Sequence, residues 1–349
     1  MNKISPLRRA VPTPDTLVDE SGKPAFGTFS QTFKQFDLLR FKSSSKFRKL
    51  INKLRLTEWE AVEVISAKGA FLTAVYKFGI LDINLTVFFE KENGKLHVWN
   101  NMDLFLNRCH LAKTLFDGRS SVYQTKKAKT VITNNYETGM AVCQGFAKNK
   151  KSGRIEFDFG LKRMSKPSVV SIPIKGVYPV YTEKDIFKFN GSIKIDGIEM
   201  TDNDSMAVID DHRGYYPRKS GYDWLTTFKY RDLDDKKVPF GLNLTDFRLN
   251  PKQFDYNENG YWDKTNFHLL PITHFERNGK IKTIKDSFGD INLTLETTAM
   301  HKVSLNLLLF RIDYQLSFGK LNGYITDQDN NKIEFRDDLA LSEYRYTII

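Results

Sequence analysis

The segment from Asp210 to Pro217 reads Asp-Asp-His-Arg-Gly-Tyr-Tyr-Pro and is followed closely by Trp224. It combines two carboxyls, an imidazole, a guanidinium and three aromatic rings, more chemistry than any other stretch of the chain. Such a mixture can form an acid–base site walled by aromatic rings, where burial tunes the carboxyl pKa. It can equally form a polar corner of a β-protein whose side chains hydrogen-bond neighbouring backbone amides. The first arrangement predicts an enzyme and the second a structural joint.

Two later segments combine polar and aromatic residues in a similar way. They are 240–245, Phe-Gly-Leu-Asn-Leu-Thr, and 257–262, Asn-Glu-Asn-Gly-Tyr-Trp. Consecutive β-elements bring residues distant in sequence onto one sheet face, so the three segments could line one cavity. The plain alternative is that their side chains satisfy exposed backbone groups at strand ends. The candidates for ligand binding are Asp210, Arg213, Tyr215, Tyr216, Trp224, Asn243, Asn257, Glu258, Asn259 and Trp262, with Asp211 and His212 as catalytic candidates.

Apolar and polar residues alternate with a period of two along much of the chain, which predicts half-buried strands. The clearest cases are Leu81–Val87, Ile155–Phe159 and Ile291–Leu295. Turn sequences such as Asn93-Gly94, Asp196-Gly197 and Asn278-Gly279 separate these runs and predict antiparallel hairpins. The aromatic content of 13% suits a sheet-rich protein. We therefore expect a mainly antiparallel β-protein of two barrels or sandwiches with a few short helices.

One helix is expected from Ser45 to Leu56. Phe47, Leu50, Ile51 and Leu54 recur at helical spacing, and lysine and arginine residues cover the remaining surface. The basic face is typical of a solvated helix, and it is also the composition of a helix that contacts anionic lipid or nucleic acid. Residues 46–55 are therefore the candidate for contact with an anionic surface.

The length of 349 residues favours two domains. The proline-containing stretch 166–188 is the most plausible boundary, and the strand pattern restarts after it. The expected organisation is an extended segment 1–25, a basic β-barrel-like domain 26–180 and a second β-barrel-like domain 181–349 that carries the Asp211 to Pro217 run. Charge supports this division, because residues 1–175 contain 30 Lys and Arg against 15 Asp and Glu, whereas residues 176–349 contain 23 against 27.

Several classes of function have no motif in this chain. The sequence has no Walker loop, no dinucleotide-binding Gly-x-Gly-x-x-Gly, no Gly-x-Ser-x-Gly elbow and no His-Glu-x-x-His. Cys109 and Cys143 form no CxxC pair, and the six histidines include no close pair at chelating spacing. We expect no cofactor and no metal. The start of the chain has no signal-peptide pattern and no run is long and apolar enough for a membrane span, so a cytoplasmic, soluble protein is expected.

The three polar-aromatic segments together resemble a bacterial domain-of-unknown-function family, family 2804. The resemblance rests on 211–217, Asp-His-Arg-Gly-Tyr-Tyr-Pro, with Trp224, on Gly-Leu-Asn-Leu-Thr at 241–245, and on Asn-Glu-Asn before Trp262, and it extends over most of the chain. More distantly, Gly-x-x-x-x-Asp-Gly followed by an acidic residue beside His212 and then an aromatic residue is similar to the carotenoid hydratase and AttH-like group. That similarity implies two lipocalin-like β-barrels. The chain departs from that group in having Met206-Ala207-Val208-Ile209 where the group has a Trp-containing motif.

The distant resemblance implies addition of water to an isoprenoid-like double bond. In that case Asp211 would be the acid, with Asp210 raising its pKa by like-charge repulsion. The carbocation would be stabilised by the ring of Tyr215, Tyr216 or Trp224, and His212 or Glu258 would position the water.

Three function classes follow in order of support. The first is a protein that binds an apolar small molecule, lipid or isoprenoid-like, in a β-barrel cavity. The second is a hydratase or isomerase that acts on such a molecule. The third is a basic protein that binds an anionic lipid surface or nucleic acid, and nucleic acid has the weakest support because the chain has no recognised nucleic-acid-binding motif.

Overall fold

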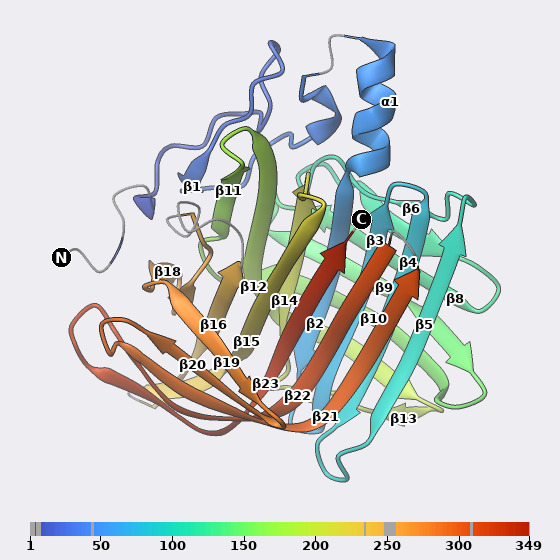
Figure 1. Ribbon diagram of the computed structural model, residues 1–349. Coiled ribbons are helices and arrows are strands. Elements are labelled where there is room, and N and C mark those ends of the chain that lie inside the picture. Colours follow the sequence, from blue (N-terminus) through green and yellow to red (C-terminus); the bar gives the residue numbers. More distant parts are fainter. Residues whose placement is uncertain are drawn as a thin grey trace.

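In the computed structural model two strongly curled antiparallel sheets, each a half-barrel, pack against one another (Figure 1). The structure describes residue 4 and residues 8–42, 45–233, 235–247, 256–307 and 310–348. The expected fold class, mainly antiparallel β with two curled β-units, is confirmed. Residues 1–3 and 5–7 of the expected N-terminal segment lie outside the described residues.

The first sheet has 14 strands and is built from the N-terminal part of the chain. Its strands are β1 (Gly27–Phe29), β2 (Thr57–Ile65), β3 (Gly69–Phe78), β4 (Leu81–Glu90), β5 (Leu96–Leu104), β6 (Cys109–His110), β7 (Ser120–Gln124), β8 (Ala128–Asn135), β9 (Met140–Asn149), β10 (Gly153–Arg163), β11 (Ser168–Ile174), β12 (Tyr178–Ile195), β13 (Ile198–Glu199) and β14 (Met206–Gly214). The main path runs β5-β4-β3-β2-β14-β12-β10-β9-β8-β7-β6.

The second sheet has nine strands in the order β18-β17-β16-β15-β23-β22-β21-β20-β19. They are β15 (Lys219–Leu233), β16 (Lys236–Phe247), β17 (Gly260–Asp263), β18 (Asn266–Leu269), β19 (Thr273–Asn278), β20 (Ile281–Asp286), β21 (Ile291–Leu307), β22 (Phe310–Thr326) and β23 (Lys332–Ile348). The chain passes from the first sheet to the second between Gly214 and Lys219. The domain boundary expected at 180/181 stays a prediction about separate folding units, but β12 and β14 on its C-terminal side belong to the first sheet.

The period-two pattern marks real strands. In β10 the alternating Ile155, Phe157, Phe159 and Leu161 are buried, while the residues between them are more exposed. The predicted hairpin turns are also present. Asp196 and Gly197, between β12 and β13, both have positive φ angles, +48° and +85°, as a two-residue hairpin turn of the primed type requires.

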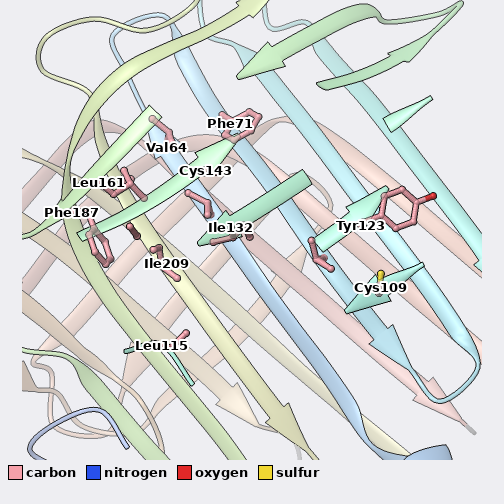
Figure 2. Packing of buried hydrophobic residues seen from close by; sticks show 14 of the residues in the cluster. Val64, Phe71, Cys109, Leu115, Tyr123, Ile132, Cys143, Leu161, Phe187 and Ile209 are labelled. Carbon is pink, nitrogen blue, oxygen red and sulfur yellow. The ribbon is translucent and has the colours of Figure 1, made fainter. Parts of the chain in front are cut away.

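The interior of the first half-barrel is filled by apolar side chains. Phe71, Ile132, Leu161, Phe187 and Ile209 come from different strands and pack against one another there (Figure 2). The ring centroids of Phe71 and Phe157 lie 5.2 Å apart. This interior therefore has the close packing of an ordinary core rather than the open lumen of a ligand-binding barrel.

A second apolar layer joins the two sheets. It is formed by the outer face of β3 and β4 and by strands of the second sheet, and the rings of Phe89 and Phe318 stack across it with centroids 5.4 Å apart. The second sheet encloses its own core, which includes Leu242, Leu293 and Phe335.

The predicted helix is confirmed as α1 (Lys46–Arg55), whose N-cap is Ser45, and a short 3-10 helix η2 (Leu38–Arg40) precedes it. α1 lies over one end of the first sheet (Figure 1) and has no buried residue. Within the described ranges, the structure contains no helix of sufficient length and hydropathy to cross a bilayer.

Candidate functional site

Strand β14 lies in the middle of the first sheet, between β12 and β2, and all of its nine residues are buried. One of its faces points into the filled interior of the first half-barrel, and the other points toward the second sheet. Because side chains alternate along a strand, Asp210 and His212 share one face while Asp211 and Arg213 share the other. The two halves of the predicted site therefore lie on opposite sides of the sheet.

The face that carries Asp210 lines a cavity of about 140 Å³ between the two sheets. Both sheets contribute to its wall. The lining residues are Trp59, Ala61, Glu63, Leu72, Ala74, Tyr76, Phe78, Leu81, Ile83, Leu85, Asn100, Met102 and Asp210 from the first sheet, with Tyr222, Trp224, His301, Val303, Ile312, Tyr314, Glu343 and Arg345 from the second.

Strand register defines an outer and an inner end of this cavity. Trp59 pairs with Tyr76 and Tyr76 with Ile83, so these residues form one row across β2, β3 and β4. Met102, opposite Ile83, continues this row and is 46% exposed, which places the opening at this end. Glu63 is opposite Leu72 two rows further along, toward the end where Phe89 and Phe318 close the gap between the sheets.

An ion-pair network joins two of the predicted segments beside the cavity. Lys184 Nζ lies 3.2 Å from Asp210 Oδ1 and 2.6 Å from Glu258 Oε2. Thr245 donates to Glu258 Oε1 at 2.7 Å, and the indole of Trp59 donates to Asp210 Oδ2 at 3.4 Å. Burial raises the pKa of Asp210 to about 6, against the opposing effect of Lys184 and with a further contribution from Glu258. Asp210 is thus a carboxyl whose protonation changes close to neutral pH.

Two further carboxyls line the same cavity. Burial and the Asp210 carboxylate raise the pKa of Glu63 well above its ordinary value, which favours its protonated form. Burial also raises the pKa of Glu343, while the hydroxyls of Tyr314 and Tyr222, which donate to it at 2.6 and 2.9 Å, oppose the shift. Among the described residues, Glu63 Oε2 has no hydrogen-bond partner. A carboxyl whose environment favours the protonated form and a carboxyl that ionises near pH 6 therefore line one apolar cavity, which is the pairing that acid–base chemistry uses.

His212 is neutral and held between rings. Its imidazole stacks on Trp59, with centroids 3.8 Å apart and planes within 2°, and its Nε2 is hydrogen-bonded to the hydroxyl of Tyr216. Burial lowers the pKa of His212 well below its ordinary value, and the positive charges of Lys184 and Arg345 lower it further. His212 lines a small cavity of about 20 Å³ together with Asp210, Trp224 and Glu258. It can accept or relay a hydrogen bond but is unsuited to carry a positive charge.

The opposite face of β14 is a closed polar cluster. Arg213 donates to both oxygens of Asp211, at 2.9 and 2.7 Å, and to Glu58 at 2.9 Å. Its guanidinium also lies 4.5 Å from the centroid of the Phe36 ring. Asp211, 0% exposed, has its charge satisfied here and does not line the inter-sheet cavity. The sequence hypothesis gave Asp211 the role of acid, but the structure places Asp210 at the cavity instead.

The other predicted residues divide between the cavity and its supports. Trp224 lines the cavity, and its indole donates to Asn243 Oδ1 at 2.7 Å. Asn243 in turn donates to the Glu258 carbonyl at 2.9 Å, so it holds the loop that presents Glu258. Tyr215 faces the first interior and donates to the Leu38 carbonyl at 2.8 Å.

Three predicted residues lie away from the cavity. Asn259 accepts from the Thr245 amide at 2.6 Å and donates to Thr273 at 3.0 Å. Asn257 accepts from the Asn259 amide at 3.0 Å, and Trp262 donates to the Lys166 carbonyl at 3.1 Å. The Asn259 contacts link β16 to β19 of the second sheet, and the Trp262 contact links the second sheet to the loop between β10 and β11.

Sequence reasoning missed three residues that line the cavity, namely Glu63, Glu343 and Arg345, and it missed Lys184, which pairs with Asp210 beside the cavity. Each stands in a strand-like run, as Glu63 does between Val62 and Val64, where a charged residue ordinarily marks the solvent face. These residues can be recognised only once their strands are known to lie between two neighbours in a sheet that is covered on both sides. The sequence alone does not show that position. Among the described residues, no cluster of three or more His, Cys, Asp or Glu side chains is arranged to hold a metal ion.

Comparison with solved structures supports a fold made of two β-units. The crystal structure of CghA with Sch210972 superposes with a TM-score of 0.51 at 7% sequence identity, over 95% of this chain and 97% of that one. The crystal structure of kievitone hydratase from Nectria haematococca gives a TM-score of 0.43 at 10% identity, over 84% of this chain and 90% of that one. No curated protein sequence matches the chain significantly. The family model described as "Domain of unknown function (DUF2804)" matches residues 8–347, so the chain belongs to that family.

Proposed function

We propose that the protein binds a predominantly apolar small molecule in the cavity between its two sheets. The observation that carries this proposal is the composition of that cavity: aliphatic and aromatic side chains form most of its wall, and a few ionisable groups, among them Glu63, Asp210 and Glu343, interrupt it. Wall rings and a few placed polar groups are the usual features of a small-molecule site. The interior of the first half-barrel is filled, so the ligand lies between the β-units instead of inside one.

The polar groups of the cavity define the ligand further. Glu63 Oε2 and Arg345 Nη1 are buried, belong to lining residues and have no hydrogen-bond partner among the residues that the structure describes. Leaving such atoms unpaired costs about 1–3 kcal/mol each. A hydroxyl or carbonyl group of the ligand beside either atom would relieve part of that cost. We therefore expect an oxygenated hydrocarbon, of which a linear isoprenoid alcohol is the simplest probe.

Binding is testable with Ala74→Phe, which places a ring in the cavity. Trp59 and Trp224 line the site, so farnesol should quench tryptophan fluorescence and raise the melting temperature of the native protein. Ala74→Phe should abolish both effects while the protein remains folded. Ala67→Phe, which adds the same ring at an exposed turn, is the matched control and should bind as the native protein does. Unaltered quenching by farnesol in Ala74→Phe would contradict the proposed site.

The carboxyls favour a second, more specific function, which is acid–base catalysis on the bound molecule. The raised pKa of Glu63 suits it to give a proton to an alkene carbon, while the Asp210 carboxylate can take a proton from the adjacent carbon or from an attacking water. Removal of a proton from the adjacent carbon moves the double bond, and removal of a proton from the attacking water completes the addition of water across the double bond. The rings of Trp59, Tyr76 and Trp224 supply negative faces toward a cationic intermediate.

Solvent exchange measures this chemistry without knowledge of the natural substrate. Protein incubated with farnesol in D₂O should introduce carbon-bound deuterium, detected by mass spectrometry, and Glu63→Gln should reduce the rate by about 100-fold or more. Glu60→Gln changes the neighbouring buried glutamate on the opposite face of β2 and should keep the native rate. If deuterium exchange persists in Glu63→Gln, Glu63 is not the acid. If Glu63→Gln loses both the exchange and the fluorescence quenching by farnesol, Glu63 has a role in binding only.

A further inference from the structure

Helix α1 presents its apolar stripe to solvent. Phe47 and Leu50 are 71% and 55% exposed, Ile51 and Leu54 are exposed as well, and no residue of the helix is buried. An amphipathic helix on a globular protein ordinarily turns this stripe toward the core. Here Ser45 caps the helix by accepting from the Arg48 amide at 3.3 Å, and the described part of the chain leaves the apolar face of the helix uncovered.

The rest of the helix surface is basic. α1 contains five lysine and arginine residues and no aspartate or glutamate. A helix of this kind, apolar on one side and cationic on the other, lies in the plane of a lipid surface with its rings and aliphatic chains among the acyl groups. Its cations then contact anionic head groups.

The exposed apolar surface continues from α1 onto the end of the first sheet. The Gly79 amide, in the turn between β3 and β4, donates to the carbonyl of Leu56 directly after α1. The Phe105 amide, in the loop after β5, donates to the carbonyl of Ile80 in that same turn at 2.9 Å. Ile80, Leu104 and Phe105 are 41%, 58% and 74% exposed. We call the surface made by Phe47, Leu50, Ile80, Leu104, Phe105 and Leu106 the apolar rim.

The apolar rim adjoins the opening of the inter-sheet cavity. Phe78 and Leu81, which flank the Gly79-Ile80 turn, both line the cavity, and so does Met102, two residues before Leu104. In Figure 1 α1 stands at the upper end of β2 and β3, the end at which this turn connects β3 to β4. The inner carboxyls lie further along the same strands, away from the rim.

We propose that the apolar rim docks on the surface of an anionic phospholipid bilayer, so that the cavity opens toward the membrane and exchanges its apolar ligand with it. The charge of α1 favours anionic over neutral lipid, and the exposed rings favour a bilayer over nucleic acid, which offers phosphates but no apolar layer to receive them. The proposal of docking depends only on the apolar rim, whereas the proposal of ligand exchange also depends on the proposed function, the binding of an apolar molecule in the cavity.

Vesicle flotation tests docking on the full chain without added ligand. The protein should float with vesicles of phosphatidylcholine mixed with phosphatidylglycerol and stay in solution with phosphatidylcholine alone, and high salt should reduce binding. Phe47→Glu should weaken binding by about tenfold or more, and Lys49→Gln by about fivefold. Ile198→Glu is the matched control: Ile198 is 67% exposed on β13, at the end of the molecule opposite α1 (Figure 1), and its replacement should leave binding unchanged.

The outcomes separate docking from ligand binding. Ala74→Phe, with a filled cavity, should still float with anionic vesicles, since the rim is intact. Equal binding of Phe47→Glu and the native protein, or equal loss in Ile198→Glu, would overturn the proposal. So would failure to bind vesicles accompanied by self-association on sizing that Phe47→Glu abolishes, because a second copy of the chain would then be the partner of the rim. Unchanged melting temperatures of the exposed variants verify that folding is not the cause.

Discussion

The two faces of β14 carry similar side chains in opposite states. On the interior face, Asp211 receives two hydrogen bonds from Arg213, which also pairs with Glu58. On the cavity face, Asp210 shares Lys184 with Glu258, and Glu63 nearby keeps one oxygen that has no hydrogen-bond partner among the residues described. On the interior face the charged groups are paired within the protein. On the cavity face, polar atoms that could accept or donate further hydrogen bonds lie beside an apolar cavity.

This difference separates architecture from function better than residue type does. Buried ion pairs with complete hydrogen bonding fix the packing of neighbouring strands, and removing one partner leaves an uncompensated charge. Incompletely paired carboxyls at a cavity cost stability and are kept where a ligand or a reaction uses them. The aspartate that the sequence hypothesis made catalytic is on the closed face, and its neighbour is on the open one.

Breaking the closed face should have the largest effect. Arg213→Met removes both hydrogen bonds to Asp211 and strands its carboxyl in the interior, so the free energy of unfolding should fall by about 3–5 kcal/mol in urea denaturation. At pH 7 Asp210→Asn should cost about 1 kcal/mol, because Lys184 keeps Glu258 as its partner. Arg119→Met, at an exposed ion pair, is the control and should change stability by less than about 1 kcal/mol. An Asp210→Asn loss as large as that of Arg213→Met would remove the distinction between the faces.

The second prediction concerns pH and the open face. Burial raises the pKa of Asp210 to about 6, so the folded protein keeps a proton that the unfolded chain releases near pH 4. The stabilisation from this proton is complete below about pH 4 and is lost as pH rises through 6. Asp210→Asn lacks the group, so its free energy of unfolding relative to the native protein should rise by about 2 kcal/mol between pH 4 and pH 7. A constant difference over that range, measured by urea denaturation, would contradict the raised pKa.

His212 provides a smaller effect of opposite sign. Because burial lowers its pKa, the folded state binds a proton less readily than the unfolded chain, and its contribution to stability is present above about pH 6.5 and is lost as pH falls. His212→Phe keeps a ring on Trp59 but gives up the contact with Tyr216, at a cost of about 1–2 kcal/mol near pH 7. The variant should lose less stability than the native protein on acidification to pH 5. If the two proteins lose stability in parallel, His212 does not titrate as its burial implies.

Much of the fold was accessible from the sequence, because short-range rules govern it. Alternation in Ile155–Phe159 identified β10, and Asp196-Gly197 has the residues that a tight hairpin turn needs. The helix was predicted within a residue at each end from its cap and apolar spacing. The sequence pattern did not show which strands belong to which sheet, because strand order depends on pairing between residues far apart in the sequence, such as that of β2 with β14.

The site was predictable only in part. Asp210, Trp224, Asn243 and Glu258 do converge, as the grouping of polar and aromatic segments suggested. The face of the sheet on which each residue lies could not be predicted from the sequence, because β14 is buried on both faces and its burial pattern has no alternation. Glu343 was overlooked for a related reason: in a strand buried on both sides, a functional carboxyl and a solvent-facing one look alike in sequence.

The central claim is that the cavity between the sheets holds an apolar small molecule. Native mass spectrometry of the protein purified from cells, followed by organic extraction, tests it most directly. The native protein and Ala67→Phe should both carry a bound hydrophobic compound that extraction recovers, and Ala74→Phe should carry none. The same compound in equal amount on Ala74→Phe would contradict the claim, because the added ring fills the space that the ligand is proposed to occupy.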